Sequence, residues 1–188
     1  KNTRIQYCGQ ACLIGVSGAI SAENCLFADA GSYSFLGYFG GSYQFNHCTF
    51  ADYSFFTNRN GGHFGLTNTL RDGNGFLIST LPLSMSLKHS IIWGYKSEEI
   101  ALDRSDRSAF DISNTSYNLL KTQDELEVFK GNQNFFNRDP LFTSTSNGDY
   151  HLEANSNAIN QIPSLSLPVD LEGKPRNNPT DIGAYEFQ

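Results

Sequence analysis

The sequence predicts an all-β fold in which the chain winds into a solenoid of short, parallel, stacked strands. The first observation is a repeat: residues 21–29 return as residues 44–52, with a cysteine, an aromatic residue and a closing Ala-Asp at matching positions. The second is a set of three glycines that recurs at one constant offset (31 − 9, 37 − 15 and 40 − 18 are all 22), namely Gly9, Gly15 and Gly18 followed by Gly31, Gly37 and Gly40. A repeat of this length indicates coils that stack on one another. The recurring glycines predict turns with positive φ, which glycine adopts without strain.

The composition agrees with strands joined by tight turns. The chain of 188 residues holds 17 Gly, 15 Phe and 9 Tyr, against one Met and one Trp. Aromatic residues favour pleated strands, and glycine favours turns. The formal net charge of −6 argues against nucleic acid as a partner. No apolar run reaches the ~18 residues of a membrane helix, so the sequence predicts no membrane-spanning segment.

The elements expected in each coil are short. Apolar strands are predicted at residues 12–14, 34–36, 64–70, 85–92 and 112–120, with a last rung at residues 132–136. Residues 96–107 carry alternating charges, which indicates a longer loop or a lateral strand. Residues 122–129 begin with a capping box, which predicts one short helical turn. We expect about five or six coils, with insertions after Trp93.

One position of the repeat carries a polar residue in every coil. The predicted ladder runs through Asn24, His47, Asn68 and His89, at steps of 23, 21 and 21 (47 − 24, 68 − 47, 89 − 68). Neighbouring strands lie ~4.8 Å apart, so stacked amides and imidazoles can form hydrogen bonds along the solenoid axis. The ladder is therefore predicted to be structural.

The four cysteines all lie in the first quarter of the chain. Cys25 and Cys48 follow the first two residues of the ladder, and we predict that they are free thiols buried as small apolar groups. Cys8 and Cys12 are the pair that a disulfide would join. The cysteines do not show the paired short spacings of a zinc site, so no metal is expected.

Five short motifs follow one another in the last fifty residues of the chain (188 − 138). They are Asp139-Pro140-Leu141-Phe142, Gly148-Asp149-Tyr150-His151-Leu152, Ser156-Asn157-Ala158-Ile159, Asp170-Leu171-Glu172-Gly173-Lys174-Pro175-Arg176 and Asp181-Ile182-Gly183-Ala184-Tyr185-Glu186. This segment resembles the C-terminal cassette of bacterial right-handed parallel β-helix repeat proteins of the pectin-lyase-like superfold, with a choice-of-anchor Q type ending. The chain departs from that pattern at Asn157, Asn160 and Gln161, where the family has Pro, Asp and Gly.

The resemblance implies a division of the chain and a location. Residues 1–138 would form the coils of a right-handed parallel β-helix, as the C-terminal part of a longer solenoid, and residues 139–188 would form a cap packed on the last coil. It also implies a secreted protein or one at the bacterial cell surface, associated with the outer membrane. The chain starts at Lys1 with no leader, so we expect that a leader was removed or that a longer parent was cut.

Enzymes of this superfold suggest where catalytic carboxylates would lie. Asp29 and Asp52 share one repeat position (52 − 29 = 23), so we expect them on neighbouring strands within ~5 Å of each other. Such a pair can share a proton, hold a cation or simply end a strand as solvated carboxylates. Arg71 and Asp72 are expected near the same place in the next coil. No complete set of acid and base residues is recognisable, and no cofactor is expected, with calcium implied only for a lyase.

Aromatic residues are the other candidate binding groups. The candidates are Tyr33, Tyr38, Tyr43 and Tyr53. Alternation with serine at residues 32–35 and 53–55 predicts that some aromatic rings point outward, where they would stack on sugar rings. Phe39, Phe55 and Phe56 belong to the same group. If most of these rings lie inside the coils, glycan binding by stacking loses support and binding of a partner protein gains.

The function that the sequence favours is a non-catalytic, secreted or cell-surface module that binds a polysaccharide or another envelope protein. One alternative is a polysaccharide lyase or glycoside hydrolase. Another is a structural subunit of a bacterial envelope complex.

Overall fold

The computed structural model describes residues 1–54, 59 and 61–188, and their fold is all-β with parallel sheets. A six-stranded parallel sheet contains β1 (Thr3–Cys8), β4 (Cys25–Ala30), β7 (Thr49–Asp52), β12 (Ile91–Gly94), β15 (Leu119–Leu120) and β16 (Phe135–Phe136). A four-stranded parallel sheet contains β3 (Ala19–Glu23), β6 (Gly41–Asn46), β11 (Leu83–Lys88) and β14 (Phe110–Ser116). A second four-stranded parallel sheet contains β2 (Ile14–Val16), β5 (Phe35–Tyr38), β8 (Phe64–Thr67) and β13 (Ile100–Asp103).

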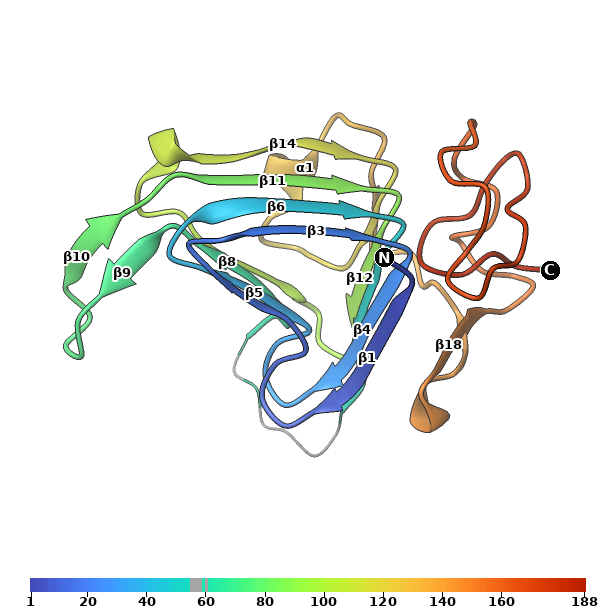
Figure 1. Ribbon diagram of the computed structural model, residues 1–188, viewed down its shortest axis with the longest axis horizontal. Coiled ribbons are helices and arrows are strands. Elements are labelled where there is room, and N and C mark those ends of the chain that lie inside the picture. Colours follow the sequence, from blue (N-terminus) through green and yellow to red (C-terminus); the bar gives the residue numbers. More distant parts are fainter. Residues whose placement is uncertain (55–58, 60) are drawn as a thin grey trace.

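The chain visits the three sheets in the same order on each of its first four circuits, as the ribbon shows (Figure 1). Each circuit starts in the six-stranded sheet, continues through the sheet of β2 and returns through the sheet of β3. In the six-stranded sheet Thr3 pairs with Cys25, Leu26 with Thr49, Thr49 with Ile91 and Ile91 with Leu119. The sequence interval between paired positions is therefore 22 for the first circuit (25 − 3), 23 for the second (49 − 26), 42 for the third (91 − 49) and 28 for the fourth (119 − 91).

The long third circuit explains why one predicted ladder residue is wrong. Its interval of 42 (91 − 49) equals two predicted steps of 21, so Asn68 looked like a rung between His47 and His89. Asn68 lies instead between β8 and β9 (Thr69–Arg71), where its side chain donates to the Asp106 carbonyl at 2.7 Å. The extra length of this circuit includes the antiparallel hairpin of β9 and β10 (Leu77–Thr80), so an insertion also precedes Trp93.

The polar ladder lies at the corner where each circuit passes from the sheet of β3 to the six-stranded sheet, and it consists of Asn24, His47, His89 and Tyr117. Asn24 donates its N–H to the carbonyl before His47, His47 to the carbonyl before His89, and His89 to the carbonyl before Tyr117. These four residues have φ of 50°, 50°, 53° and 52°, which is the left-handed region. Asn and His adopt this region more readily than most residues, which gives the repeated polar position a backbone reason.

The next position along the chain forms a second ladder. It runs through Cys25, Cys48, Ser90, Asn118 and Asn134. Asn118 is fully buried; its side chain donates to the carbonyl of Leu87 at 2.7 Å and to Asn134 Oδ1 at 2.9 Å, and accepts from the N–H of Ser90 at 2.9 Å. Cys25 and Cys48 are buried free thiols, as the sequence predicted. Cys8 and Cys12, for which a disulfide was left open, are also free.

The recurring glycines have a different role from the predicted one. Among Gly9, Gly15, Gly18, Gly31, Gly37 and Gly40, only Gly40 has positive φ. Gly15 and Gly37 are paired in neighbouring strands, and a Cβ on either would approach the ring of Tyr43 to 2.5 or 2.7 Å. These two glycines therefore recur because a buried tyrosine needs their space.

The inner core draws on all three sheets. Rings of Phe27 and Phe50 stack at 5.3 Å with an interplanar angle of 18°, as the repeat predicted. Further along the chain Ile92 and Leu120 continue this row of inward residues. The helix α1 (Leu126–Phe129) adds the fully buried ring of Phe129 to the same core.

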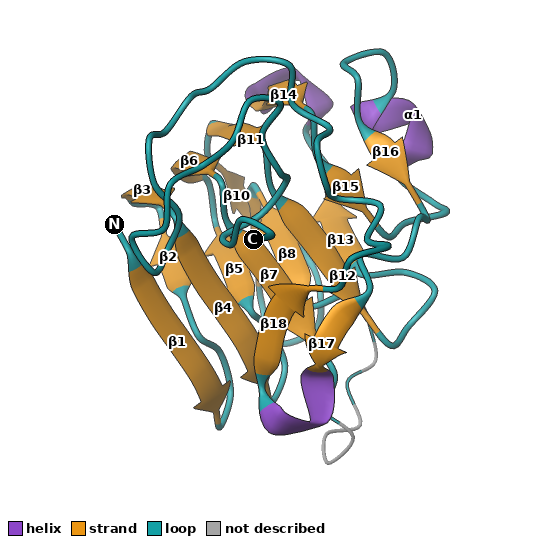
Figure 2. Cartoon of the chain, turned by 90° about the vertical axis from the view of Figure 1, so that its right-hand side faces the viewer, coloured by secondary structure: helices purple, strands orange, loops and turns teal. Residues whose placement is uncertain are grey.

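The C-terminal segment packs in another place than predicted. Residues 139–188 lie against the outer face of the six-stranded sheet across several circuits, and not on the last coil alone (Figure 2). Outward residues of the sheet, such as Leu26, Ile91 and Trp93, form one core with Tyr150 and Ile182 of this segment. The outward residues of β4, β7 and β12 are mostly apolar, so the outer face of this sheet needs a cover as well as the inner face. The C-terminal segment provides it, and every residue of the three strands is buried. The segment includes the hairpin of β17 (Phe142–Ser144) and β18 (Asp149–Leu152), and we call residues 139–188 the cassette.

Two smaller expectations are met. Residues 122–129 contain α1, and the hydroxyl of Thr122 accepts the N–H of Glu125 at 3.0 Å, which is one half of a capping box. The other half is absent, because the N–H of Thr122 donates to Asn137 at 3.1 Å. Residues 96–107 contain β13, the lateral strand, followed by the short helix η1 (Arg107–Ala109). No helix in the described ranges is long and apolar enough to cross a membrane.

The second ladder leads to a stability prediction. Asn118→Ala removes the acceptor of the buried N–H of Ser90 and a donor to the carbonyl of Leu87, so we expect unfolding free energy to fall by about 2 to 4 kcal/mol. Urea denaturation measures this loss. Asn132→Ala is the matched control: its amide is exposed and donates only to Ser113, and we expect a loss below about 0.5 kcal/mol. Equal losses in both variants would contradict the ladder's role.

Candidate functional site

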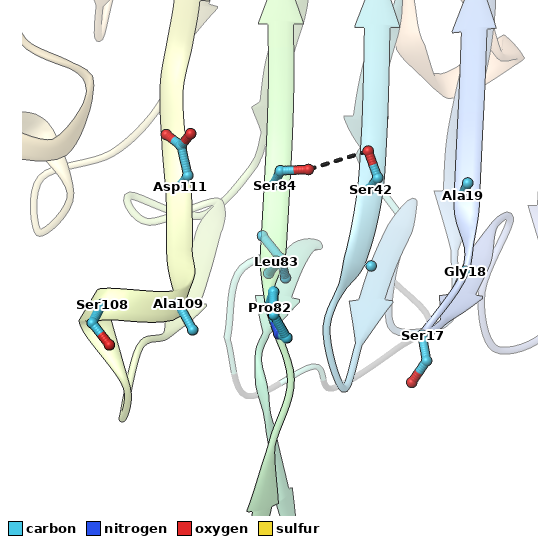
Figure 3. Close-up of a pocket in the computed structure, with 11 residues that line it drawn as sticks. Ser17, Gly18, Ala19, Ser42, Pro82, Leu83, Ser84, Ser108, Ala109 and Asp111 are labelled. Atoms are coloured by element: carbon cyan, nitrogen blue, oxygen red, sulfur yellow. Dashed lines mark hydrogen bonds between the residues drawn. The ribbon is translucent and has the colours of Figure 1, made fainter.

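The outer face of the β3, β6, β11 and β14 sheet carries side chains in regular rows, and most of these side chains are polar. Register places Ala19, Ser42, Ser84 and Asp111 in one row across the four strands. The next rows are Ser21, Gln44, Ser86 and Asn114, then Glu23, Asn46, Lys88 and Ser116. Figure 3 shows the first row, in which the hydroxyl of Ser84 donates to that of Ser42 at 3.1 Å.

Strand alternation creates this array. In β6 the rings of Tyr43 and Phe45 point into the inner core and are buried, whereas Ser42 and Gln44 are exposed. The same alternation in β11 places the buried Met85 between Ser84 and Ser86, and the buried Leu87 between Ser86 and Lys88. One pattern thus forms the inner core and the polar face together.

The polar face is hollowed along its length. A hollow of about 590 Å³ lies where the strands begin, lined by residues that include Gly18, Pro82 and Ala109. Further hollows of about 330, 380 and 180 Å³ lie on the same sheet, and Lys88 lines two of them. We call this face, with its hollows, the polar trough.

Two projecting structures bound the polar trough. At the start of the strands the β9–β10 hairpin extends beyond the sheets (Figure 1), and its Phe76, Leu77 and Ile78 are exposed. At the other end Ser166 of the cassette lines a hollow together with Lys88 and His89. The trough therefore runs along the strands from an apolar hairpin to the cassette.

The chemistry of the trough suits an extended polar polymer. Hydroxyl and amide side chains donate and accept hydrogen bonds, and they repeat at the strand spacing of ~4.8 Å. The rows contain the acidic Glu23 and Asp111 and the basic Lys88, so no single charge dominates the face. Sequence analysis missed the trough, although the alternation Ser42-Tyr43-Gln44-Phe45 returns as Ser84-Met85-Ser86-Leu87.

The predicted carboxylate pair is assembled, but inside the protein. Asp29 and Asp52 follow paired residues of β4 and β7, as the repeat predicted, and both are buried. Tyr150 of the cassette donates its hydroxyl to Asp29 Oδ1 at 2.5 Å, and the second oxygen of Asp29 is buried without a hydrogen-bond partner among the described residues. Burial raises the pKa of both carboxyls. Neither carboxylate lines any of the four hollows of the polar trough.

A buried ion network that the sequence did not reveal holds Asp52. Arg59 binds Asp52 Oδ2 through Nε at 2.5 Å and Glu99 Oε2 through a terminal nitrogen at 2.7 Å. His63 lies 3.9 Å from the same Glu99 oxygen, and its Nδ1 is 2.5 Å from the hydroxyl of Ser34. Burial raises the pKa of Glu99 to about 7.

Ser34, His63 and Glu99 are arranged in the order of a Ser-His-acid catalytic triad, but solvent and substrate cannot reach the serine hydroxyl. All three side chains are fully buried, so no substrate reaches the hydroxyl in this structure. The network therefore ties Arg59 to the end of β7 and to the residue that precedes β13. No spacing in the sequence marked it, because its members come from three different circuits.

Arg71 and Asp72 lie away from the carboxylate pair, which corrects their predicted position. Both belong to the β9–β10 hairpin, where Arg71 contacts Asp103 at 3.6 Å and Ser105 at 2.6 Å. Asp72 accepts the N–H groups of Asn74 and Phe76 at 2.9 Å and closes the hairpin turn. The error has the same cause as that for Asn68: the long third circuit was taken for two coils, so Arg71 and Asp72 do not occupy the repeat position of Asp52.

The candidate aromatic residues do not form an exposed row. Tyr43 is fully buried and donates to the Gly40 carbonyl at 2.8 Å. Tyr53 is half-buried against the cassette, and Tyr33 and Tyr38 are also half-buried, like Phe39. Phe55 and Phe56 lie outside the described residues. The row of exposed rings that sugar stacking by these tyrosines would require is therefore not present.

Comparison of the chain with protein-family models, with curated proteins and with solved structures finds no match. Among the residues that the structure describes, no three His, Cys, Asp or Glu side chains are grouped so that they could hold a metal ion.

The buried network predicts a pH-dependent loss of stability in a variant. Arg59→Met leaves Asp52 and Glu99 without their cation, so at about pH 8 we expect unfolding free energy to fall by about 3 to 5 kcal/mol. A carboxyl whose pKa is raised in the folded state contributes stability below its ordinary pKa and loses it as pH rises through the raised value. Glu99 has a raised pKa of about 7, so the penalty should be smaller at about pH 5.

Denaturant unfolding at the two pH values tests this prediction. Arg71→Met is the matched control, because its contact with Asp103 is half-exposed and should be worth less than about 1 kcal/mol at either pH. A penalty for Arg59→Met that does not grow with pH would show that Glu99 is charged throughout the range.

Proposed function

We propose that the protein is a right-handed parallel β-helix of the pectin-lyase-like kind and that its polar trough binds a polysaccharide chain without cleaving it. The parallel circuits through three sheets support the β-helix, and the cassette motifs support its kinship with bacterial proteins of the choice-of-anchor Q type. The same resemblance supports a location outside the cell or at the bacterial outer surface.

The observation that carries the binding proposal is the register of the trough. Three rows of side chains in four parallel strands present hydroxyl, amide and single charged groups to solvent, over a run of hollows. Polysaccharide chains offer hydroxyl groups at regular intervals, and such groups are bound by arrays of hydrogen bonds. Because the candidate tyrosines are buried or half-buried, binding would rest on these hydrogen bonds.

The same structure gives little support to a lyase or a glycoside hydrolase. Such enzymes need carboxylates on an open groove, with room for substrate between them. Asp29 and Asp52 are buried, and the rows of the trough offer only Glu23 and Asp111, which stand at opposite edges of the sheet. We therefore propose a binding function.

A partner protein of the cell envelope is the second candidate, and a specific feature favours it. The β9–β10 hairpin exposes 71% of Phe76 and 60% of Ile78, and exposed apolar side chains in contiguous positions mark protein contacts. On this view the protein would be a structural subunit of an envelope complex.

Substitutions in the trough test the first proposal. Ser84→Tyr fills the largest described hollow, so we expect at least about tenfold weaker binding of a neutral or acidic polysaccharide. Gln44→Ala removes one donor and one acceptor and should cost about fivefold. Affinity electrophoresis in gels containing each polysaccharide measures both effects.

Ser79→Tyr is the matched control, since Ser79 is exposed on β10 outside the four hollows and its replacement should leave binding unchanged. Equal loss in the control, or no retardation by any polysaccharide, would contradict binding in the trough. Loss of pull-down of envelope proteins in Phe76→Ser would then support the second candidate.

A further inference from the structure

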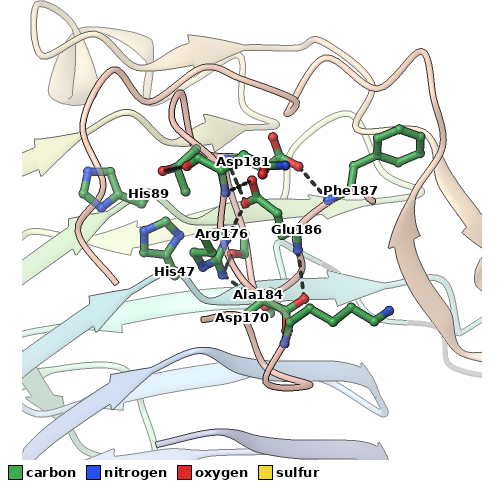
Figure 4. A network of polar contacts seen from close by, with 12 residues as sticks. His47, His89, Asp170, Arg176, Asp181, Ala184, Glu186 and Phe187 are labelled. Atoms are coloured by element: carbon green, nitrogen blue, oxygen red, sulfur yellow. Dashed lines mark hydrogen bonds and ion pairs between the residues drawn. The ribbon is translucent and has the colours of Figure 1, made fainter. Parts of the chain in front are cut away.

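The polar ladder of Asn24, His47 and His89 holds one edge of the cassette. Asn24 donates to the carbonyl of Val169 at 2.8 Å, and its own oxygen accepts from Arg176 at 3.0 Å. His47 Nε2 lies 2.7 Å from the hydroxyl of Ser166. His89 Nδ1 lies 2.9 Å from Asn46 Oδ1 of the sheet and 3.3 Å from the same hydroxyl, and the His89 carbonyl accepts the N–H of Gly183 at 2.8 Å. Three successive rungs thus contact the cassette, at Ser166 and Val169, at Arg176 and at Gly183. Figure 4 shows two of these rungs, His47 and His89, beside Arg176.

A positive charge on His47 would be poorly compensated in this interface, because the backbone of Gly183 favours it while burial, Arg176 and His89 oppose it. The His47 ring is fully buried, and its Nδ1 has no hydrogen-bond partner among the described residues. The rings of His47 and His89 lie 4.8 Å apart, so protonation of both would place two cations in contact. The Arg176 guanidinium is a third, and its charge already acts on both histidines.

The acidic groups of the cassette near the two histidines are already occupied. Arg176 is paired with Glu186 at 3.1 Å. Asp170, Asp181 and Glu186 accept backbone N–H groups of the cassette at 2.7 to 3.1 Å. Among the described residues, no hydrogen bond or ion pair joins these carboxylates to either histidine ring, so none of them is a direct partner for a new positive charge.

The sheet side is no more favourable to a protonated pair. Lys88 adds a further positive charge beside His89. Glu23 lines the hollow of the polar trough that Lys88 and His89 also line, and its carboxylate is paired with Lys1 at 2.6 Å. The named charges that act on the two rings, those of Arg176 and Lys88, are thus both positive.

We propose that His47 and His89 form an acid-sensitive latch: protonation of this pair releases the cassette from the outer face of the six-stranded sheet. Release would break the contacts at Ser166, Gly183 and Arg176 together, and it would expose the apolar residues around Trp93. It would also open the end of the polar trough that Ser166 lines. The latch does not depend on any ligand of the trough.

The electrostatics of the pair give the direction of the effect. Burial, then Arg176, then His89 lower the pKa of His47 well below its ordinary value. Burial, then Lys88, then Arg176 lower the pKa of His89 to about 4. A histidine with a lowered pKa contributes stability above its ordinary value of 6.5, and this contribution is lost as pH falls toward the lowered value.

Two cassette carboxyls act in the opposite direction. Burial raises the pKa of Asp181 and of Glu186, so these groups bind protons in the docked state and favour docking at low pH. Protonation of Glu186 also removes the counter-charge of Arg176, which strengthens its repulsion of the histidines. The contribution of the latch is therefore measured as a difference between the parent protein and variants without these two histidines.

The single tryptophan reports release directly. Trp93 is 5% exposed and lies in the core that the sheet shares with the cassette. Its fluorescence emission should shift to longer wavelength when the cassette leaves, whereas far-UV circular dichroism follows the strands of the sheets. In an acid titration of the parent protein we expect the fluorescence change at a higher pH than the loss of dichroism.

The test variant is His47→Asn with His89→Asn. Both positions have left-handed φ, which Asn adopts well, and Asn24 already binds the cassette from the equivalent rung. Without the pair, the fluorescence midpoint should move down by about one pH unit or merge with the dichroism transition. His151→Asn is the control, since His151 contacts Asp149 and Glu172 away from the ladder, and it should keep the parent midpoint.

An unchanged midpoint in the double variant, or an equal shift in His151→Asn, would overturn the latch. Coincident fluorescence and dichroism transitions in the parent would also overturn it, because the cassette would then leave only when the sheets unfold. If the double variant lacks native dichroism at neutral pH, His89→Asn alone decides the question and should show a smaller downward shift.

Discussion

The fold depends on the burial of both faces of the six-stranded sheet. Every residue of β4, β7 and β12 is buried, with Phe27, Phe50 and Ile92 on the inner side and residues such as Leu26 and Ala51 on the outer side. A parallel sheet with two apolar faces requires a cover on each. The other two sheets cover the inner face, and the cassette covers the outer face.

The corner that carries the polar ladder turns the chain and also binds the cassette, and both roles follow from its backbone conformation. The chain turns there with left-handed φ in successive circuits, and this geometry favours Asn and His over most apolar residues. The polar side chains that the turn favours are then available to bind the cassette. A local backbone requirement thus also supplies the contacts that hold residues distant in sequence.

The features that repeat could mostly be predicted from the sequence, and those that do not repeat mostly could not. The stacking of Phe27 on Phe50 and the neighbouring positions of Asp29 and Asp52 follow from a constant interval, so the first circuits could be read directly. Asn68 was misplaced because one circuit with an interval of 42 (91 − 49) imitates two of 21. Length alone does not distinguish an insertion from another coil.

No constant sequence interval marked the contacts between distant segments. Ser34, His63 and Glu99 meet because three successive circuits bring them together, and no common spacing joins them. The docking of the cassette likewise depends on the outward residues of β12, whose apolar run was visible but whose orientation was not. Alternation was the one usable signal for the trough, and it appears in β6 and β11 as serine or glutamine between large apolar residues.

The difference between the covered sheet and the open one lies in the size and polarity of outward side chains. Leaving Leu26, Ile91 or Trp93 in water would each forgo about 1.5 to 3 kcal/mol, so the cassette binds that sheet. A similar cover over Ser42, Gln44 or Asn114 would have to replace the hydrogen bonds that these groups make with water. The polar sheet therefore stays accessible in the folded protein, and a ligand that occupies it must itself supply hydrogen-bonding groups along the strands.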